Sequence, residues 1–371
     1  MAGIAAVAFY FPRHVITSDE YRRGAGQFDA QGIDEKRVPG FDEDAITMAV
    51  AAGERCLAAI GPMSVDILAY ATAGTLSGGA IVADALGIDA AKARDVRGSR
   101  DAGETALAGA VDGATKDGTT HLVIATDAPR GEAPSPEENA FGAAAAAILV
   151  TPKGRVSWKR GSVPSQSVIR HLVGDIGAVS VLLSFLTSVE SSDVAGDLDL
   201  AGALKSRAPV TYDQYVAMCR RGAPAGTEFS QGAYVSLAAY LAEKKARYRL
   251  IGERCMACGR LHFPPREACL ACGARSWEDV PLKRTGTVYA YTIIGKGAAP
   301  SEFLEQQLAV GEYATAVVEL DEGPRIAAML TDVDPTTVRV GMPVRMVFRR
   351  IYTQEGVPRY GFKFARASAV G

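Results

Sequence analysis

Residues 251–280 read IGERCMACGRLHFPPREACLACGARSWEDV and contain four cysteines, Cys255, Cys258, Cys269 and Cys272. The cysteines form two Cys-x2-Cys pairs separated by ten residues. Two chelating pairs at this spacing are typical of one tetrahedral zinc ion with four thiolate ligands. Because four sulfurs leave no open position for water, we expect a structural rather than a catalytic metal. Two disulfides, four separate core thiols or a redox motif are the less favoured interpretations.

The bulk composition excludes some classes of function. The chain has 371 residues, enough for two or three domains, and its formal net charge of −2 gives no electrostatic basis for binding nucleic acid or an anionic membrane. Residues 1–16 lack the basic and apolar regions of a signal peptide and are expected to form a first strand. The remaining thiols, Cys56 and Cys219, stand alone. These features fit a reducing cytoplasm.

The first half of the chain has the pattern of an α/β domain. Up to about residue 153, short apolar strands alternate with helices, which favours a layered fold with a mostly parallel sheet. Residues 168–189, VIRHLVGDIGAVSVLLSFLTSV, are the longest apolar segment but contain charged residues, so we expect a buried helix and not a membrane span. Further helices are expected at 211–221 and 230–249.

The last third alternates apolar and polar residues with period two. Five segments have this pattern, which predicts five strands and a small closed barrel, most simply an OB-fold. They are 286–294, 314–322, 324–333, 343–352 and 359–368. The expected domains are 1–210 (α/β layered), 211–250 (helical linker or docking segment), 251–280 (zinc ribbon) and 281–371 (OB-fold).

The C-terminal third also carries family motifs in a fixed order. Besides the cysteine pairs these are Phe263–Arg266, Gly286–Val288, Val318–Arg325, Leu330–Val333 and Gly341–Val344. On these motifs the region resembles the zinc-ribbon and OB-fold family called domain of unknown function 35. The resemblance implies a partner of thiolases and related acyl-CoA enzymes.

Motifs of a second family run through the first half. They are Glu35-Lys36, Val38–Ala49, Ile81–Gly87, Ala102–Leu107, and Gly174–Gly177 with Ser180 and Leu182-Leu183. On these residues the half resembles prokaryotic 3-hydroxy-3-methylglutaryl-CoA synthase, a thiolase-fold enzyme. The resemblance implies a truncated thiolase-like α/β domain, in which Gly174–Gly177 resembles that family's Gly-Asn loop.

The catalytic groups of that family are missing from this sequence. In the segment DVRGSRDAGETAL, residues 95–107, the position of the nucleophilic cysteine falls on Arg100. The loop of the acidic general base is shortened to Thr72–Ser77 and contains no carboxylate. A long segment with the family's histidine is absent between Val156 and Ser167. With all three groups lost together, the resemblance implies a degenerate domain without thiolase chemistry.

Several residues remain as candidates for other roles. Ser99 could replace the nucleophile, although a polar turn before the helix is the simpler interpretation of Ser99 and Arg100. His262 lies in the ribbon but outside the cysteine pattern, so we do not expect it to bind the metal. Phe263, Arg266 and Lys296 are candidates for contacting CoA or an acyl chain. Structural loop residues explain the same three positions equally well or better.

The two resemblances together imply a non-catalytic, zinc-containing subunit of a thiolase or acyltransferase complex. Such a subunit would bind a separate catalytic subunit and help to hold the CoA thioester of a β-ketoacyl-CoA. Two alternatives stay open. One is an active synthase-like acyltransferase with a replaced nucleophile, and the other is a stand-alone acyl-CoA binding protein.

Overall fold

The structure is a computed structural model that describes residues 2–129, 131, 134–161, 169–190, 192–196, 198–219, 235–354 and 356–367. The chain divides into two compact units, residues 1–220 and 221–371. Each unit has its own sheets and its own hydrophobic core.

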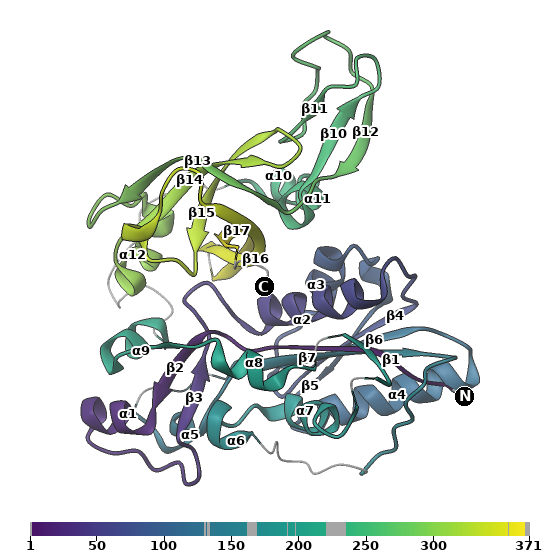
Figure 1. Cartoon of the computed structure of the whole chain (residues 1–371), viewed down its shortest axis with the longest axis vertical. Coiled ribbons are helices and arrows are strands. Elements are labelled where there is room, and N and C mark those ends of the chain that lie inside the picture. Colours follow the sequence, from purple (N-terminus) through teal and green to yellow (C-terminus); the bar gives the residue numbers. More distant parts are fainter. Residues whose placement is uncertain are drawn as a thin grey trace. The chain divides into compact units, whose positions relative to one another are not determined.

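The first unit is built on a six-stranded sheet with strand order β5-β4-β6-β7-β1-β8 (Figure 1). A small second sheet has the order β3-β2-β9. The strands are β1 (Gly3–Tyr10), β2 (His14–Thr17), β3 (Glu35–Val38), β4 (Ile67–Thr72), β5 (Ala93–Arg97), β6 (His121–Asp127), β7 (Ala144–Thr151), β8 (Ala195–Gly196) and β9 (Ala208–Pro209).

Helices cover both faces of the larger sheet, which confirms the expected thiolase-like layering. In Figure 1, α2 and α3 lie on one face and α4 and α7 on the other. The central strands β6 and β7 are therefore buried along nearly their whole length, as their apolar sequences require. The helices are α1 (Ser18–Ala25), α2 (Ala45–Ile60), α3 (Gly79–Leu86), α4 (Ala102–Lys116), α5 (Pro136–Ala140), α6 (Arg170–Val173), α7 (Ser180–Leu186), α8 (Leu200–Lys205) and α9 (Tyr212–Cys219), with 3-10 turns at Ala90–Lys92 and Gly177–Val179.

The larger sheet is mixed rather than mostly parallel. β4 runs parallel to β5 and β6, but β7 runs antiparallel to both β6 and β1. A parallel connection needs a crossover long enough to carry the chain back along the sheet. Among the described residues between β6 and β7, the one helix is α5, which has five residues and spans less than about 8 Å. The chain therefore enters β7 from the end at which β6 finishes.

The apolar segment 168–189 does not form the single helix that its composition suggested. Two glycines break it, Gly174 with φ +82° and Gly177 with φ +52°, in the left-handed region that a helix interior excludes. The result is α6, a turn, and then α7, whose seven residues are all buried. The described helices include none that is both long and apolar enough to cross a membrane.

A buried polar cluster joins elements that are distant in sequence. Lys36 on β3 donates to the Oε1 atom of Glu138 on α5 at 2.5 Å and to the hydroxyl of Tyr215 on α9 at 2.9 Å. Tyr21 on α1 donates to the other oxygen of Glu138 at 2.5 Å. Burial lowers the pKa of Lys36, which its contact with Glu138 opposes. Loss of either charge would leave the other buried without compensation.

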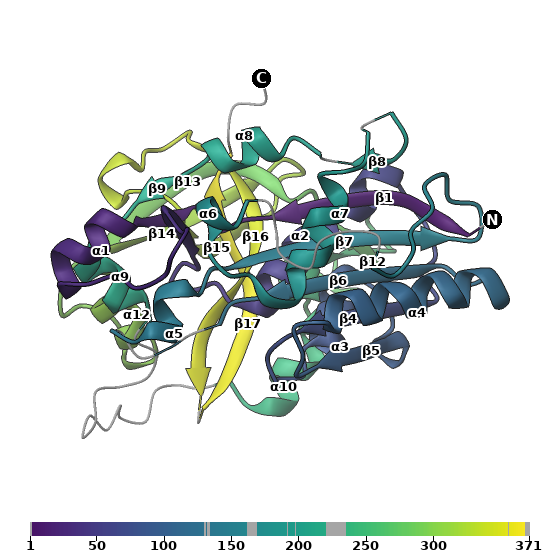
Figure 2. The ribbon, with the colours of Figure 1, turned by 90° about the horizontal axis from the view of Figure 1, so that it is seen from below.

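The second unit contains the ribbon and the barrel (Figure 2 shows β13 to β17 from below). The barrel closes in the order β13-β14-β15-β17-β16, which confirms the predicted OB-fold, and β11-β10-β12 form the ribbon sheet. Of the predicted helix at 230–249, residues 230–234 lie outside the described residues, and the described remainder forms two short helices, α10 and α11. The elements are α10 (Leu237–Ala242), α11 (Lys244–Arg249), β10 (Ile251–Cys255), β11 (Leu261–His262), β12 (Trp277–Pro281), β13 (Thr285–Ile294), α12 (Leu304–Val310), β14 (Tyr313–Leu320), β15 (Arg325–Thr331), β16 (Pro343–Gln354) and β17 (Val357–Arg366), with 3-10 turns at Ser301–Phe303 and Pro335–Thr337.

Two glycines of α4 provide a test of the packing in the first unit. A Cβ atom at Gly103 would lie 2.1 Å from the carbonyl oxygen of Ala178, whereas one at Gly109 would meet nothing within 4 Å. We expect Gly103→Ala to lower the free energy of unfolding by about 1–3 kcal/mol, because backbone must move. Gly109→Ala should raise it by about 0.5–1 kcal/mol. Urea unfolding of both variants measures the change in the free energy of unfolding. Equal changes would contradict the close contact between Gly103 and Ala178.

Candidate functional site

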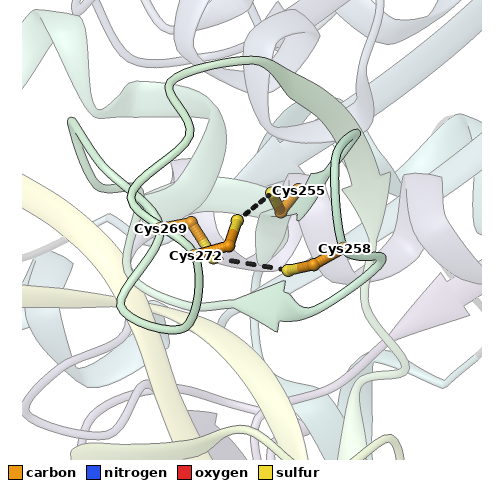
Figure 3. A group of neighbouring side chains, drawn as sticks. All are labelled: Cys255, Cys258, Cys269 and Cys272. Atoms are coloured by element: carbon orange, nitrogen blue, oxygen red, sulfur yellow. Dashed lines mark hydrogen bonds between the residues drawn. The ribbon is translucent and has the colours of Figure 1, made fainter.

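The four ribbon cysteines come together at the ends of two loops (Figure 3). Their sulfur atoms all lie within 4.8 Å of one another. Cys255 Sγ is 3.6 Å from Cys272 Sγ, and Cys258 Sγ is 3.6 Å from Cys269 Sγ. A disulfide needs about 2 Å between sulfurs, so these contacts are not disulfides. A tetrahedral ion with zinc–sulfur distances of about 2.3 Å places sulfurs about 3.8 Å apart, which the group fits.

The two loops repeat the same backbone scheme. Gly259 donates its N–H to the carbonyl of Cys255 at 2.8 Å, and Gly273 does the same to Cys269 at 2.8 Å. Both glycines have φ +75°, a conformation that favours glycine over other residues. The sequence Cys-x2-Cys-Gly therefore forms two equivalent turns that point both sulfurs of a pair inward. This repetition is the local reason for the cluster.

His262 lies behind the cluster rather than in it. Its Nε2 atom is 3.4 Å from Cys269 Sγ, and its ring packs edge-on against Trp277. Only 7% of the residue is exposed. A histidine N–H at this place would hydrogen-bond to a thiolate ligand and orient it, in the manner of outer-shell partners of metal ligands.

In the first unit, the loop predicted to resemble the Gly-Asn loop meets the start of α4. Arg100 Nη2 lies 2.6 Å from the Oδ1 atom of Asp175, and Asp175 also accepts the N–H of Gly177 at 3.1 Å. The hydrogen bond to Asp175 raises the pKa of Arg100. The arginine side chain is 59% exposed, so the pair adds little to stability. The ion pair matters locally, because it places a paired cation at the position that the family resemblance assigns to the nucleophile.

A buried carboxylate lies beside this ion pair. Asp127, at the end of β6, accepts the Thr72 hydroxyl at 2.7 Å, the Ala73 N–H at 2.9 Å and the Ala178 N–H at 2.5 Å. Burial raises its pKa to about 6, although these hydrogen bonds act in the opposite direction. Sequence reasoning missed Asp127, since an aspartate ending a strand is indistinguishable from an ordinary turn residue.

Ser99 occupies a turn before α4. Its Oγ atom accepts the N–H of Asp101 at 3.1 Å, and its carbonyl accepts the N–H of Ala102 at 3.1 Å. In the described part of the chain, no histidine hydrogen-bonds to Ser99. These contacts favour the polar-turn interpretation over an activated nucleophile, which would need a base within hydrogen-bond distance.

A cavity of about 580 Å³ is lined by residues of strands β13, β14 and β15 of the barrel. Ala316 on β14, one of the lining residues, pairs with both Tyr291 on β13 and Ala328 on β15. Most other lining groups are apolar, among them Phe303, Ile351 and Phe362, and Arg247 contributes a cation. No local signal in the sequence indicates this space, because the alanines in ATAVVEL and RIAAMLT become neighbours only through the strand register.

The three residues considered for CoA contact lie at separate places around this unit. Phe263 packs its ring against Phe362, which lines the cavity, with 5.9 Å between ring centroids. Arg266 is exposed and donates its backbone N–H to Glu253. Lys296 is exposed in the loop after β13. None of the three is among the residues that line the cavity, and their role in CoA binding stays a prediction.

Metal content should depend on the ribbon cysteines and not on the others. We expect Cys272→Ser to lose most bound zinc and to unfold the ribbon, since a structural zinc contributes about 10 kcal/mol or more to small zinc domains. The matched control is Cys219→Ser, which changes a half-buried thiol on α9. Metal analysis by mass spectrometry measures the number of zinc ions per chain in each purified variant. Equal zinc in both variants would show that the cluster does not hold the ion.

The raised pKa of Asp127 predicts a dependence of stability on pH. Between about pH 4 and pH 6 the folded state keeps this carboxyl protonated, whereas the unfolded chain ionises it. The folded state therefore binds more protons, and the free energy of unfolding falls as pH rises through this window, by about 3 kcal/mol. Asp127→Asn should lack this fall. Urea unfolding at pH 4 and pH 7 measures the difference, and parallel pH profiles would refute it.

Comparisons with known sequences agree with the domains of the second unit. Residues 242–278 match the family described as the rubredoxin-like zinc ribbon domain of ChsH2, and residues 279–349 match its C-terminal OB-fold domain. Over 123 residues the chain is 42% identical to a DUF35 domain-containing scaffold protein of Methanocaldococcus jannaschii, covering 32% of this chain and 83% of that protein.

A second relative is a benzoylsuccinyl-CoA thiolase subunit, BbsA, of Thauera aromatica. It is 30% identical over 126 residues, covering 34% of this chain and 81% of that subunit. Among solved structures, 3-hydroxy-3-methylglutaryl-CoA synthase complexed with CoA matches 60% of this chain and 91% of its own, with a TM-score of 0.51 and 16% identity. That likeness shows a thiolase-like fold. By the sequence of its ribbon and barrel, the chain belongs to the DUF35 family.

Proposed function

We propose that this chain is a non-catalytic, zinc-containing accessory subunit of a thiolase or thiolase-like acyltransferase complex. The observation that carries the proposal is the ion pair of Arg100 with Asp175 at the start of α4. A thiolase-fold nucleophile needs a thiol at this helix start and a base beside it. Here a guanidinium, which cannot act as a nucleophile or lose its proton, is bound to a carboxylate.

The second unit supplies the accessory part of the proposal. Relatives of this region bear the names scaffold protein and thiolase subunit. In our proposal the four cysteines hold a structural zinc, the region 281–371 forms the OB-fold, and 211–250 links it to the degenerate domain 1–210. The catalytic cysteine and histidine belong to a separate subunit, with which this chain forms a hetero-oligomer in the cytoplasm.

The barrel cavity supports a role in holding the CoA thioester of a β-ketoacyl-CoA. Its volume of about 580 Å³ lies in the range of small-molecule sites, roughly 300–1,000 Å³. Apolar walls suit an acyl or pantetheine chain, and Arg247 offers a charge for an anionic group. Phe263 would support the wall through Phe362. Arg266 and Lys296, both exposed, would contact phosphates outside the cavity.

Activity measurements test the catalytic part of this proposal. The purified chain alone should show no CoA-dependent cleavage or condensation, and the catalytic subunit should lose activity without it. Ser99→Ala should leave the activity of the complex unchanged. Turnover by the isolated chain that disappears in Ser99→Ala would instead establish an acyltransferase with a replaced nucleophile.

Filling the cavity tests the CoA part. We expect Ala328→Phe to raise the KM of the complex for its acyl-CoA by about tenfold or more, because the new ring occupies the space of the ligand. Val340→Phe, at an exposed residue of the barrel that does not line the cavity, is the matched control and should leave the KM unchanged. Steady-state kinetics of the two complexes give the comparison. An isolated chain that binds acyl-CoA but forms no complex would be a stand-alone binding protein.

A further inference from the structure

Among the described residues, Arg247 on α11 is the one charged side chain that lines the barrel cavity. The other lining residues are apolar except for threonines and Tyr291. Two glutamates lie close by, Glu243 in contact with Arg247 and Glu302 next to Phe303 in sequence, but neither lines the cavity. The cavity therefore presents a ligand with apolar walls and a single positive charge.

The guanidinium of Arg247 is held in place by an aromatic ring. Its central carbon lies 5.2 Å from the centroid of the Tyr240 ring. The Tyr240 hydroxyl accepts the backbone N–H of Tyr360 at 3.0 Å and lies 2.7 Å from the hydroxyl of Tyr248, so the ring is itself fixed. A side chain that is already positioned loses little conformational freedom when a ligand binds.

Gly361 on β17 gives the arginine its space beside the cavity. A Cβ atom at Gly361 would lie 3.1 Å from the Cγ atom of Arg247 and 3.2 Å from the Cγ1 atom of Ile351, closer than ordinary contacts. Glycine weakens the interior of a strand and often marks a close approach by another group. Here that group is the stem of the cation that lines the cavity.

The protein compensates the charge of Arg247 only in part. The Nη2 atom lies 3.2 Å from the Oε2 atom of Glu243, whose side chain is 55% exposed, and such a pair contributes little. The Nε atom is buried and has no hydrogen-bond partner within the described part of the chain. An unpaired buried donor is unfavourable, so an anion bound beside this guanidinium would be stabilised.

We propose that the ligand of the barrel cavity is a CoA thioester whose acyl chain ends in a second carboxylate, which binds Arg247 while the carbon chain contacts the apolar walls. This inference rests on the proposed CoA-holding function and names the class of its substrate. A carboxylate carries one charge, which matches one cation, and accepts charge-assisted hydrogen bonds from a guanidinium. The phosphates of CoA carry several charges, and apolar walls would leave most of their oxygens without donors.

Two CoA esters of equal acyl length separate the carboxylate from the rest of the ligand. Octanoyl-CoA and suberyl-CoA differ in that only suberyl-CoA ends in a carboxylate. Isothermal titration calorimetry of the full-length chain gives the Kd of each ester. Arg247→Gln removes the charge, and Arg247→Lys keeps it. The matched control is Lys245→Gln, which removes a cation of the same helix that does not line the cavity.

We expect the wild-type chain to bind suberyl-CoA at least about tenfold more tightly than octanoyl-CoA. Arg247→Gln should abolish this preference and leave the Kd of octanoyl-CoA unchanged, which also shows that the variant is folded. Arg247→Lys should keep part of the preference, because it keeps the charge but not the shape of the guanidinium. Lys245→Gln should keep all of it.

Other results would overturn the inference in distinguishable ways. Equal weakening of both esters in Arg247→Gln would assign the arginine to a phosphate of CoA. Equal binding of the two esters by the wild-type chain would exclude a carboxylate at this site. In both cases the proposed CoA-holding function would stand. If the wild-type chain binds neither ester, that function is wrong as well.

Discussion

The arrangement of side chains at the start of α4 depends on one buried carboxylate. Asp127 accepts hydrogen bonds from the loop after β4 and from the turn that precedes α7, so it joins two segments about 100 residues apart to the end of β6. That turn carries Asp175, and Asp175 reaches Arg100 only because the turn is fixed there. Burial of Asp127 disfavours its ionised form, as its raised pKa of about 6 shows. This unfavourable free energy accompanies the hydrogen bonds that hold the two segments in place.

The second unit achieves rigidity in a different way. Its ribbon has a short sheet and two turns, too little apolar surface to fold by burial alone. Chelation by four sulfurs supplies the missing constraint. The adjoining barrel has a conventional apolar core and also borders a cavity with mostly apolar walls, so it is stabilised by burial and needs no ion.

The ribbon and barrel were predictable from sequence because their constraints are local. Cysteine spacing fixes which sulfurs share an ion, and period-two alternation from Gly286 onward identifies each strand by itself. The cavity was not predictable, since Ala316 and Ala328 read as ordinary strand residues until the register places them side by side. Arg247 joins that site from a helix before the ribbon, at a sequence distance that no local pattern spans.

The first unit was predictable as a layered fold but not in its details. Hydrophobic composition predicted a single helix at 168–189. The structure instead has a turn there, which the positive φ angles of Gly174 and Gly177 allow. β7 runs antiparallel to β6 because α5 is too short to carry the chain back along the sheet. The sequence of residues 128–143 does not reveal how short this connection is. Arg100 was singled out from the sequence, but its contact with Asp175 became visible only in the structure, where two distant loops meet.

The pairing of Arg100 with Asp175 also bears on what a single substitution could achieve here. A cysteine placed at position 100 would replace the guanidinium and face the carboxylates of Asp175 and Asp127. Nearby negative charge holds a thiol protonated, the opposite of what a nucleophile needs. A substitution of Arg100 to cysteine would therefore introduce a thiol but not the reactivity of a thiolate nucleophile. The ion pair at the start of α4 thus makes this corner chemically unreceptive to a single-residue gain of thiol chemistry.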